Sequence, residues 1–167
     1  MKVLSTSDID EILKSNKITK KRFIGTFPSC IYPYTSRGEY SFISNTEDHT
    51  KSGMHWVAWY IKDNCVTFFD SFGRSPFSDT FPQEYTDFIG KYNLVKYTSK
   101  PIQKSESTTC GYFCIHFIYL LSLGLGFESF LEDYFDLNKN DIVVYNFYNS
   151  IIYKCVLLSQ MKQQIQH

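Results

Sequence analysis

Residues 110–123 read CGYFCIHFIYLLSL, and this stretch decides the fold that we expect. It is apolar nearly all round, which is typical of a helix buried on every face. The glycines at 124 and 126 predict where this helix ends. The longest apolar run, over residues 112–125, has about 14 residues, whereas a membrane-spanning helix needs about 20. We therefore expect a central core helix and no membrane partner.

A hairpin is predicted ahead of this helix. Residues 55–61 and 65–70 are rich in Val, Phe, Tyr and Trp, and Lys62-Asp63-Asn64 separates them. A further strand is expected at 94–97, after apolar residues that recur at helical spacing from Phe81 to Tyr92. A crossover connection is therefore expected to add this strand to the sheet. We expect an α+β fold in which a small mixed β-sheet packs against the central buried helix.

The remaining segments predict shorter elements around this core. Residues 23–36 suit loop with brief extended pieces, and 40–43 reads as a strand. An amphipathic helix opens the chain behind the capping candidates Ser5, Thr6 and Ser7. Two more helices are expected at 128–135 and from Asn140 to about Gln163.

Length and composition limit the classes of protein. The chain has 167 residues, which predicts one domain over 1–167. Seventeen basic residues balance seventeen acidic ones, so the charge gives DNA no support as a partner, although local patches stay open. Five cysteines without CxxC spacing argue against a disulfide framework and a four-ligand zinc site. The N-terminus turns polar too early for an export signal, so we expect an intracellular protein.

Cys110 is the thiol best placed to be reactive. It lies where the polar loop 104–109 meets the apolar helix, and the amides and dipole at a helix N-terminus favour a thiolate. The alternative is a small core residue that begins a helix, as expected for Cys114 one turn deeper. Position alone leaves both interpretations open.

His55 and Asp70 are the candidate partners of that thiol. His55 follows the Ser52-Gly53 turn at the start of a predicted strand, whereas His116 lies within the apolar helix. Pairing across the hairpin brings residue 70 opposite residue 56 or 57, next to His55. Each has a plainer interpretation, because His55 would otherwise be a surface histidine and Asp70 the cap of a turn.

Attack on a peptide carbonyl also needs donors for the resulting oxyanion. The backbone N–H of Cys110 and the side-chain amide of Gln103 are the candidates, although Gln103 alone also suits an ordinary loop residue. We expect Gly111 to let a substrate backbone approach, and Trp56 to form a wall of the substrate groove.

Three ordered motifs resemble the adenovirus maturation protease family, the adenains. They are Gly53-Met54-His55-Trp56, Phe69-Asp70-Ser71-Phe72-Gly73, and a glutamine, Gln103, seven positions before Cys110-Gly111-Tyr112-Phe113-Cys114. The resemblance covers roughly residues 5–125. It implies that His55 is the general base, Asp70 the orienting acid, Cys110 the nucleophile and Gln103 the oxyanion-hole donor.

The orienting acid, Asp70, distinguishes this chain from most adenoviral enzymes. This residue is usually glutamate in the adenains and aspartate in the related ubiquitin-like-protein proteases, so Asp70 indicates a divergent member. Similar short proteases occur in virophages and in transposons of the polinton type.

The resemblance implies a cysteine endopeptidase that cleaves virion or capsid precursor proteins, at Gly-rich sites, during maturation. We expect a monomer in the cytoplasm or nucleus of an infected cell and in the virion, with no cofactor and no metal. The alternatives are an isopeptidase that removes ubiquitin or a ubiquitin-like modifier, and an inactive binding module that retains the cleft.

One feature departs from the adenains. Their activating peptide forms a disulfide with a cysteine eleven positions before the glutamine, and that position is Tyr92 here. A covalent peptide activator is therefore not expected.

Overall fold

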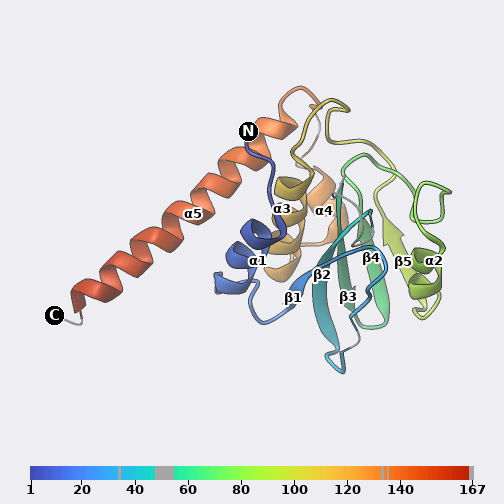
Figure 1. The fold of residues 1–167 in the computed structure, drawn as a ribbon, viewed down its shortest axis with the longest axis horizontal. Helices are drawn as coiled ribbons and strands as arrows, with labels where there is room; N and C mark the ends of the chain where they lie inside the picture. Colours follow the sequence, from blue (N-terminus) through green and yellow to red (C-terminus); the bar gives the residue numbers. More distant parts are fainter. Residues whose placement is uncertain (34, 48–54, 133, 135, 166–167) are drawn as a thin grey trace.

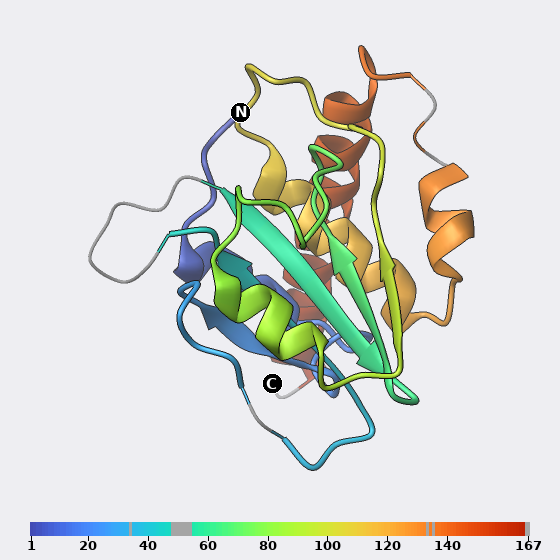
Figure 2. The same ribbon diagram turned by 90° about the vertical axis from the view of Figure 1, so that its right-hand side faces the viewer.

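The computed structural model describes residues 1–33, 35–47, 55–132, 134 and 136–165, with side chains described as far as residue 153. A five-stranded sheet, in the order β1-β2-β3-β4-β5, lies between two layers of helices (Figures 1 and 2). The elements are α1 (Thr6–Ser15), β1 (Phe23–Phe27), β2 (Glu39–Asn45), β3 (Trp56–Lys62), β4 (Cys65–Phe69), α2 (Gln83–Ile89), β5 (Leu94–Tyr97), α3 (Cys110–Ser122), α4 (Phe127–Glu132) and α5 (Asn140–Ile165).

The predicted hairpin is present as β3 and β4. Lys62 pairs with Cys65, so a two-residue turn joins the strands. Both turn residues have positive φ, 50° at Asp63 and 59° at Asn64, which matches the right-handed twist of the strands. The turn expected at residues 52–53 lies outside the described residues.

The sheet is mixed, as expected. The central strand β3 is antiparallel to both of its neighbours, β2 and β4, whereas β1 pairs with β2 and β5 pairs with β4 in parallel. The crossover between β4 and β5 carries α2, which is shorter than the predicted 81–92. Pro82 stands at the N-cap of α2 and Gly90 at the C-cap, so the helix covers only the residues between them. Phe81 and Tyr92 still pack in the same cluster as the helix.

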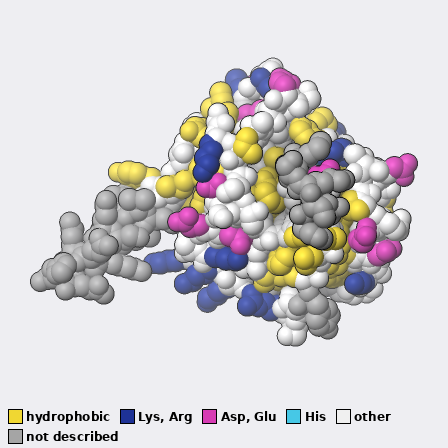
Figure 3. Space-filling view, viewed as in Figure 1, with side chains coloured by type: hydrophobic (Ala, Val, Ile, Leu, Met, Phe, Trp, Pro, Cys, Tyr) yellow, Lys and Arg dark blue, Asp and Glu magenta, His cyan; other side chains and the backbone are white. Residues whose placement is uncertain are grey.

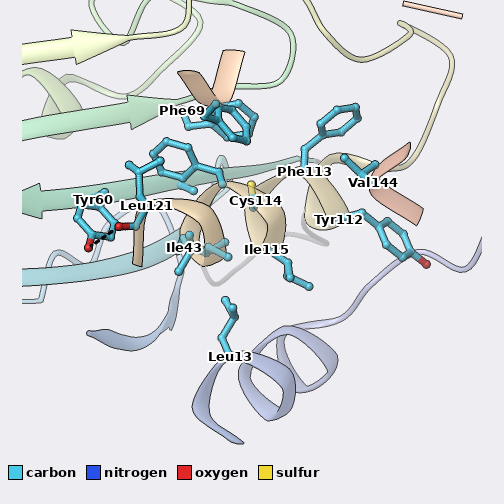
Figure 4. Close-up of a cluster of buried hydrophobic side chains, with 14 of the residues drawn as sticks. Leu13, Ile43, Tyr60, Phe69, Tyr112, Phe113, Cys114, Ile115, Leu121 and Val144 are labelled. Carbon is cyan, nitrogen blue, oxygen red and sulfur yellow. Dashed lines mark hydrogen bonds between the residues drawn. The ribbon is translucent and has the colours of Figure 1, made fainter. Parts of the chain in front are cut away.

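Side chains that alternate along the strands form a separate core on each face of the sheet. On the face covered by α2, the Trp59 ring lies 4.9 Å from that of Tyr85 and 5.5 Å from that of Phe88. On the face covered by α3, Phe69 stacks on Phe117 at 4.8 Å. Figure 4 shows part of this second cluster gathered around α3.

The central helix predicted from the apolar stretch is α3. Every residue from Cys110 to Ile118 is buried, because the sheet, α1, α4 and α5 surround this part of the helix. α1 begins with the predicted N-terminal cap, since Ser5 and Asp8 form a reciprocal capping box. α4 ends earlier than expected, and residues 133 and 135 lie outside the described residues. α5 crosses α3 and then extends beyond the body of the molecule (Figure 1).

Candidate active site

A cleft of about 690 Å³ opens where α3 begins. Four of the candidate site residues contribute to its wall, although 55 positions separate the first from the last. They come from the start of β3, from the loop before α3 and from the first position of α3: His55, Trp56, Gln103 and Cys110.

His55 and Asp70 are in direct contact, as the hairpin register predicts. Ala58 pairs with Phe69, so Asp70 follows β4 beside the residues that open β3. His55 Nε2 lies 2.7 Å from Asp70 Oδ1. Because Nε2 faces the carboxylate, Nδ1 is the ring nitrogen left for another partner.

Asp70 has several further partners and is fully buried. The Phe72 N–H donates to Oδ1 at 3.1 Å, so Asp70 also caps the turn after β4. Arg74 donates to Oδ2 from its side-chain Nε at 2.6 Å. Burial acts to raise the pKa of Asp70, but the hydrogen bonds from His55 and Arg74 outweigh it, and the pKa is lowered. The carboxylate therefore stays charged beside the imidazole.

Arg74 is a site residue that sequence reasoning missed. Its guanidinium carbon lies 5.3 Å from the centre of the Phe72 ring, and that ring stacks on His55 at 4.7 Å. Asp70 and Phe72 thus contact the His55 ring directly, and Arg74 contacts both of these residues. Arg74 directly follows the Phe-Asp-Ser-Phe-Gly motif, and this position was the only hint in the sequence. Spacing along the chain does not predict which residue a long arginine side chain contacts.

The pKa of His55 is set by opposing effects. Burial of the ring acts to lower it, but hydrogen bonds with Asp70 and with the Cys110 thiol outweigh burial and raise it above its ordinary value. The negative charges of Asp70 and of a Cys110 thiolate also favour the charged ring. His55 is therefore held between a carboxylate and a thiol, ready to carry a proton.

Cys110 is the first residue of α3 and is 8% exposed, on the wall of the cleft. The preceding residue, Thr109, makes no side-chain capping bond to the helix. The first amides of a helix have no partner within it. The thiol therefore lies beside N–H groups that remain available to an incoming oxygen.

Gln103 is 2% exposed and is held by both ends of its amide. Its Oε1 accepts from the Ser71 hydroxyl at 2.6 Å, and its Nε2 donates to the Ser107 carbonyl at 2.9 Å. An amide nitrogen carries two hydrogens, so one N–H remains for a ligand in the cleft. Ser71 is part of the quoted motif, but its contact with Gln103 spans 32 positions and was not predicted.

Gly73 has no side chain and therefore lets the turn after β4 lie close to the loop that carries Gln103. It adopts φ +69°, and a Cβ built there would lie 2.3 Å from the backbone carbon of Lys100. Next to this contact, Ile102 and Gln103 both donate their N–H to the Ser71 carbonyl, at 2.9 and 3.1 Å. Any side chain at position 73 would push the Gln103 loop away from Asp70.

The structure corrects the role expected of Gly111. A Cβ on Gly111 would meet Leu4 at 3.2 Å and Trp56 at 3.3 Å, so these two side chains cover the glycine. The close approach that glycine permits is therefore to the protein's own N-terminal segment and leaves no room there for a substrate backbone. Trp56 lines the cleft as expected, with its indole N–H donating to the Leu4 carbonyl at 3.1 Å.

The other candidates lie away from the cleft. Cys114 is fully buried under the sheet, and its thiol donates to the Trp56 carbonyl at 3.4 Å. His116 bonds to the Tyr134 hydroxyl and packs on Phe147, and burial lowers its pKa to about 4. Both are core residues, as their position in the apolar helix indicates. His49 and His167 lie outside the described residues.

No family model and no curated protein matches this chain. Fourteen chains of solved structures match it in three dimensions. The chain is similar to a solved protease. The crystal structure of the ASFV pS273R protease superposes with a TM-score of 0.58 and 17% identity, over 83% of this chain and 64% of that one. Its Se-Met form gives a TM-score of 0.55, 17% identity, and coverage of 83% and 65%.

These comparisons confirm the α+β fold, which this chain shares with the ASFV protease. The chain covers less than two thirds of that protein's length. No comparison assigns the chain to the adenovirus or virophage proteases, so that relationship still rests on the quoted motifs.

The described residues hold no group of three or more His, Cys, Asp or Glu side chains arranged to bind a metal ion. None of their helices has the length and apolar character that crossing a membrane requires.

Proposed function

We propose that this chain is a cysteine endopeptidase in which Cys110 is the nucleophile, His55 the general base and Asp70 the acid that orients the base. The observation that carries the proposal is the 2.7 Å contact between His55 and Asp70 at a cleft that the Cys110 thiol also lines. A nucleophile, a base and an orienting group within mutual reach form the arrangement that covalent catalysis needs.

The first step transfers the thiol proton of Cys110 to His55 Nδ1. The thiolate attacks the carbonyl carbon of the scissile peptide, the carbonyl π electrons move to oxygen, and a tetrahedral oxyanion forms. His55 then gives its proton to the leaving amine as the C–N bond breaks, which leaves a thioester on Cys110. Water, deprotonated by His55, hydrolyses the thioester and releases the carboxylate product.

Two donors stabilise the oxyanion in this scheme. One is the backbone N–H of Cys110 at the start of α3, and the other is the second N–H of the Gln103 amide. Ser71 accounts for the orientation of that amide, since its hydroxyl donates to Oε1 and leaves Nε2 as the donor. Preorganised donors of this kind lower the barrier because they need no rearrangement during the reaction.

The proposed substrates are precursor proteins of a virion, cleaved at Gly-rich sites. The support is the resemblance of the three motifs to the adenains, together with the fold shared with the ASFV pS273R protease. We propose that the enzyme acts as a monomer in the infected cell and within the particle.

Incubation with candidate virion precursors, followed by sequencing of the new N-termini, tests the proposal. We expect cleavage at a small set of Gly-containing sites by the wild type and none by Cys110→Ala. Cleavage by the wild type that persists in Cys110→Ala would remove Cys110 from its proposed role.

One observation favours a second candidate, an isopeptidase that removes a ubiquitin-like modifier. The acid that contacts His55 is aspartate, the residue typical of the ubiquitin-like-protein proteases. Both reactions use the same atoms of the site, so only the substrate separates them. Faster release of a fluorophore from the C-terminus of a modifier than cleavage of any virion precursor would favour the isopeptidase.

A further inference from the structure

The loop that carries Gln103 is held by the start of α5, a region outside the resemblance to the adenains. The loop spans residues 102–109 and leads directly into Cys110. Its two ends contact two adjacent residues, Asn140 and Asp141, which open α5. Both are buried, at 3% and 6% exposure.

Asp141 binds the second end of the loop. Its Oδ1 accepts from the Ser107 hydroxyl at 2.8 Å and from the hydroxyl of Thr109. The two hydroxyl oxygens lie 2.8 Å apart, close enough for one carboxylate oxygen to contact both. The carboxylate is in the first turn of α5, where the helix dipole stabilises a negative charge.

The contact between Asp141 and the loop affects both proposed oxyanion donors, the Gln103 amide and the Cys110 N–H. The Ser107 carbonyl accepts from Gln103 Nε2 at 2.9 Å, so the position of Ser107 sets the orientation of the amide. Thr109 is the N-cap residue of α3, but its hydroxyl bonds Asp141 and makes no capping bond to the helix. Asp141 thus keeps the threonine oxygen away from the amides next to Cys110.

Asn140 binds the first end of the loop. Its Nδ2 donates to the Ile102 carbonyl at 3.0 Å, directly before Gln103. From the other side, the Ile102 N–H donates to the Ser71 carbonyl at 2.9 Å. The residue before Gln103 is therefore held between the Asp70 motif and α5.

We propose that Asp141 is a positioning residue for catalysis: it holds Ser107 and Thr109 so that the Gln103 amide and the Cys110 N–H point at the oxyanion. The inference rests on the proposed function, because it assigns a role within that same site. α5 thereby takes part in building the site, although none of its residues whose side chains the structure describes lines the cleft.

The test compares Asp141→Ala with a matched control, Asp136→Ala. Asp136 lies five positions earlier, and its carboxylate accepts from the Asn138 N–H and pairs with Lys139, which lie on its own segment. We expect kcat of Asp141→Ala on a cleaved peptide to fall about tenfold or more with little change in KM, because oxyanion contacts act mainly in the transition state. The control keeps the wild-type kcat.

Two thiol reagents separate positioning from loss of the fold. A peptide aldehyde adds to Cys110 and forms an oxyanion-like adduct, whereas iodoacetamide alkylates the thiol without one. Asp141→Ala is expected to bind the aldehyde about tenfold more weakly and to be alkylated at the wild-type rate. Equal losses in both reactions would show a general disturbance of the helix start and would overturn the proposal.

Conservative variants complete the test. Asp141→Asn keeps an acceptor for one hydroxyl and a donor for the other, so it should recover part of the lost kcat. Thr109→Val removes one of the two bonds, and its effect should not add to that of Asp141→Ala, because both act through one contact. Additive effects of the two substitutions would show that Thr109 and Asp141 do not act through the same contact.

Hydrogen exchange tests the inference independently of proteolysis. Asp141→Ala should speed exchange of the amides at 103–109 and leave those of β3 and β4 unchanged. If the wild type cleaves nothing, the proposed function fails, while faster exchange in that loop still supports the contact. Unchanged exchange in the loop would overturn the positioning role itself.

Discussion

Two cysteines and two histidines lie in α3 or next to it, one of each at the cleft and one of each in the core, and the two histidines differ more in their neighbours than in their burial. His55 is 7% exposed and His116 is 6% exposed. Burial acts against the charge of both rings. At His116 burial lowers the pKa to about 4, whereas at His55 the hydrogen bonds with Asp70 and Cys110 outweigh burial and raise the pKa.

The thiols differ in their exposure to the cleft. Cys110 is 8% exposed and borders the cleft, whereas Cys114, one turn along α3, is fully enclosed. Burial raises the pKa of Cys114 well above its ordinary value. Figure 4 shows its sulfur among apolar side chains of the core. The comparison teaches that the neighbours of a histidine, more than its depth, set its pKa, and this distinguishes the proposed reactive pair from the buried one.

Exchanging the thiols for alanine tests the comparison most strongly. Cys110→Ala should abolish proteolysis and keep the melting temperature, because the sulfur supplies the covalent step. Cys114→Ala should keep activity and lose about 1 kcal/mol of stability, because it leaves a small void in the core. Peptide cleavage and urea denaturation measure both effects. The reverse pattern would move the nucleophile to Cys114.

The histidines should differ in their effect on the Cys110 thiol. His55→Ala should slow alkylation of Cys110 at pH 6.5 at least about tenfold, because the imidazole no longer accepts the thiol proton. His116→Gln should leave that rate unchanged. Asp70→Asn should be milder than His55→Ala, since Asp70 orients the base and transfers no proton. Equal rates in the wild type and His55→Ala would contradict the pairing.

The two histidines should also act on stability with opposite pH dependence. His116 has a lowered pKa, so the unfolded chain binds its proton more readily, and stability falls as the pH drops from 6.5 toward 4, by up to about 3 kcal/mol. The raised pKa of His55 contributes stability below pH 6.5 that is lost as the pH rises through its folded value.

Urea denaturation of the wild type and His116→Gln between pH 7 and 4.5 measures the first effect. The variant should lose less stability on acidification, because glutamine does not titrate. Parallel curves for the two proteins would mean that His116 is charged in the folded state.

Arg74 offers a smaller change at the cleft. Arg74→Met removes the guanidinium from Asp70, so the pKa of Asp70 should rise. As the solution is acidified, the variant should therefore lose activity at a higher pH than the wild type does. The expected effect at pH 5 is a several-fold loss of kcat/KM, with little change at pH 8. Arg37→Met, an exposed arginine that donates to a backbone carbonyl, is the control. A uniform loss across the pH range would indicate a role in folding.

The last prediction is an absence of effect. Purified wild type under reducing conditions should be active without added peptide or DNA, and adding either should change the rate less than about twofold, because the net charge is zero. Figure 3 shows Lys and Arg side chains gathered at one side of the body, and the segment after α1 carries exposed Lys17, Lys20 and Lys21. DNA activation that is lost when these lysines are replaced would assign this patch a role.

The sequence by itself determined the parts of the fold that depend on neighbours along the chain. Apolar residues on every side of 110–122 require a buried helix, and a short polar break between two β-rich runs requires a hairpin. The hairpin register then brings residue 70 beside residue 55, so the contact between His55 and Asp70 was predictable.

The tertiary structure alone decided the contacts between segments that are distant in sequence. Leu4 covers Gly111, Ser71 orients Gln103, and Asp141 holds Thr109, across 107, 32 and 32 positions respectively. Periodicity and turn length do not specify which surfaces meet, because such pairings follow from how whole elements pack around the shared core. The identity of the proposed catalytic groups could therefore be predicted from local patterns, whereas the contacts that position them depend on the packing of α1, α3 and α5.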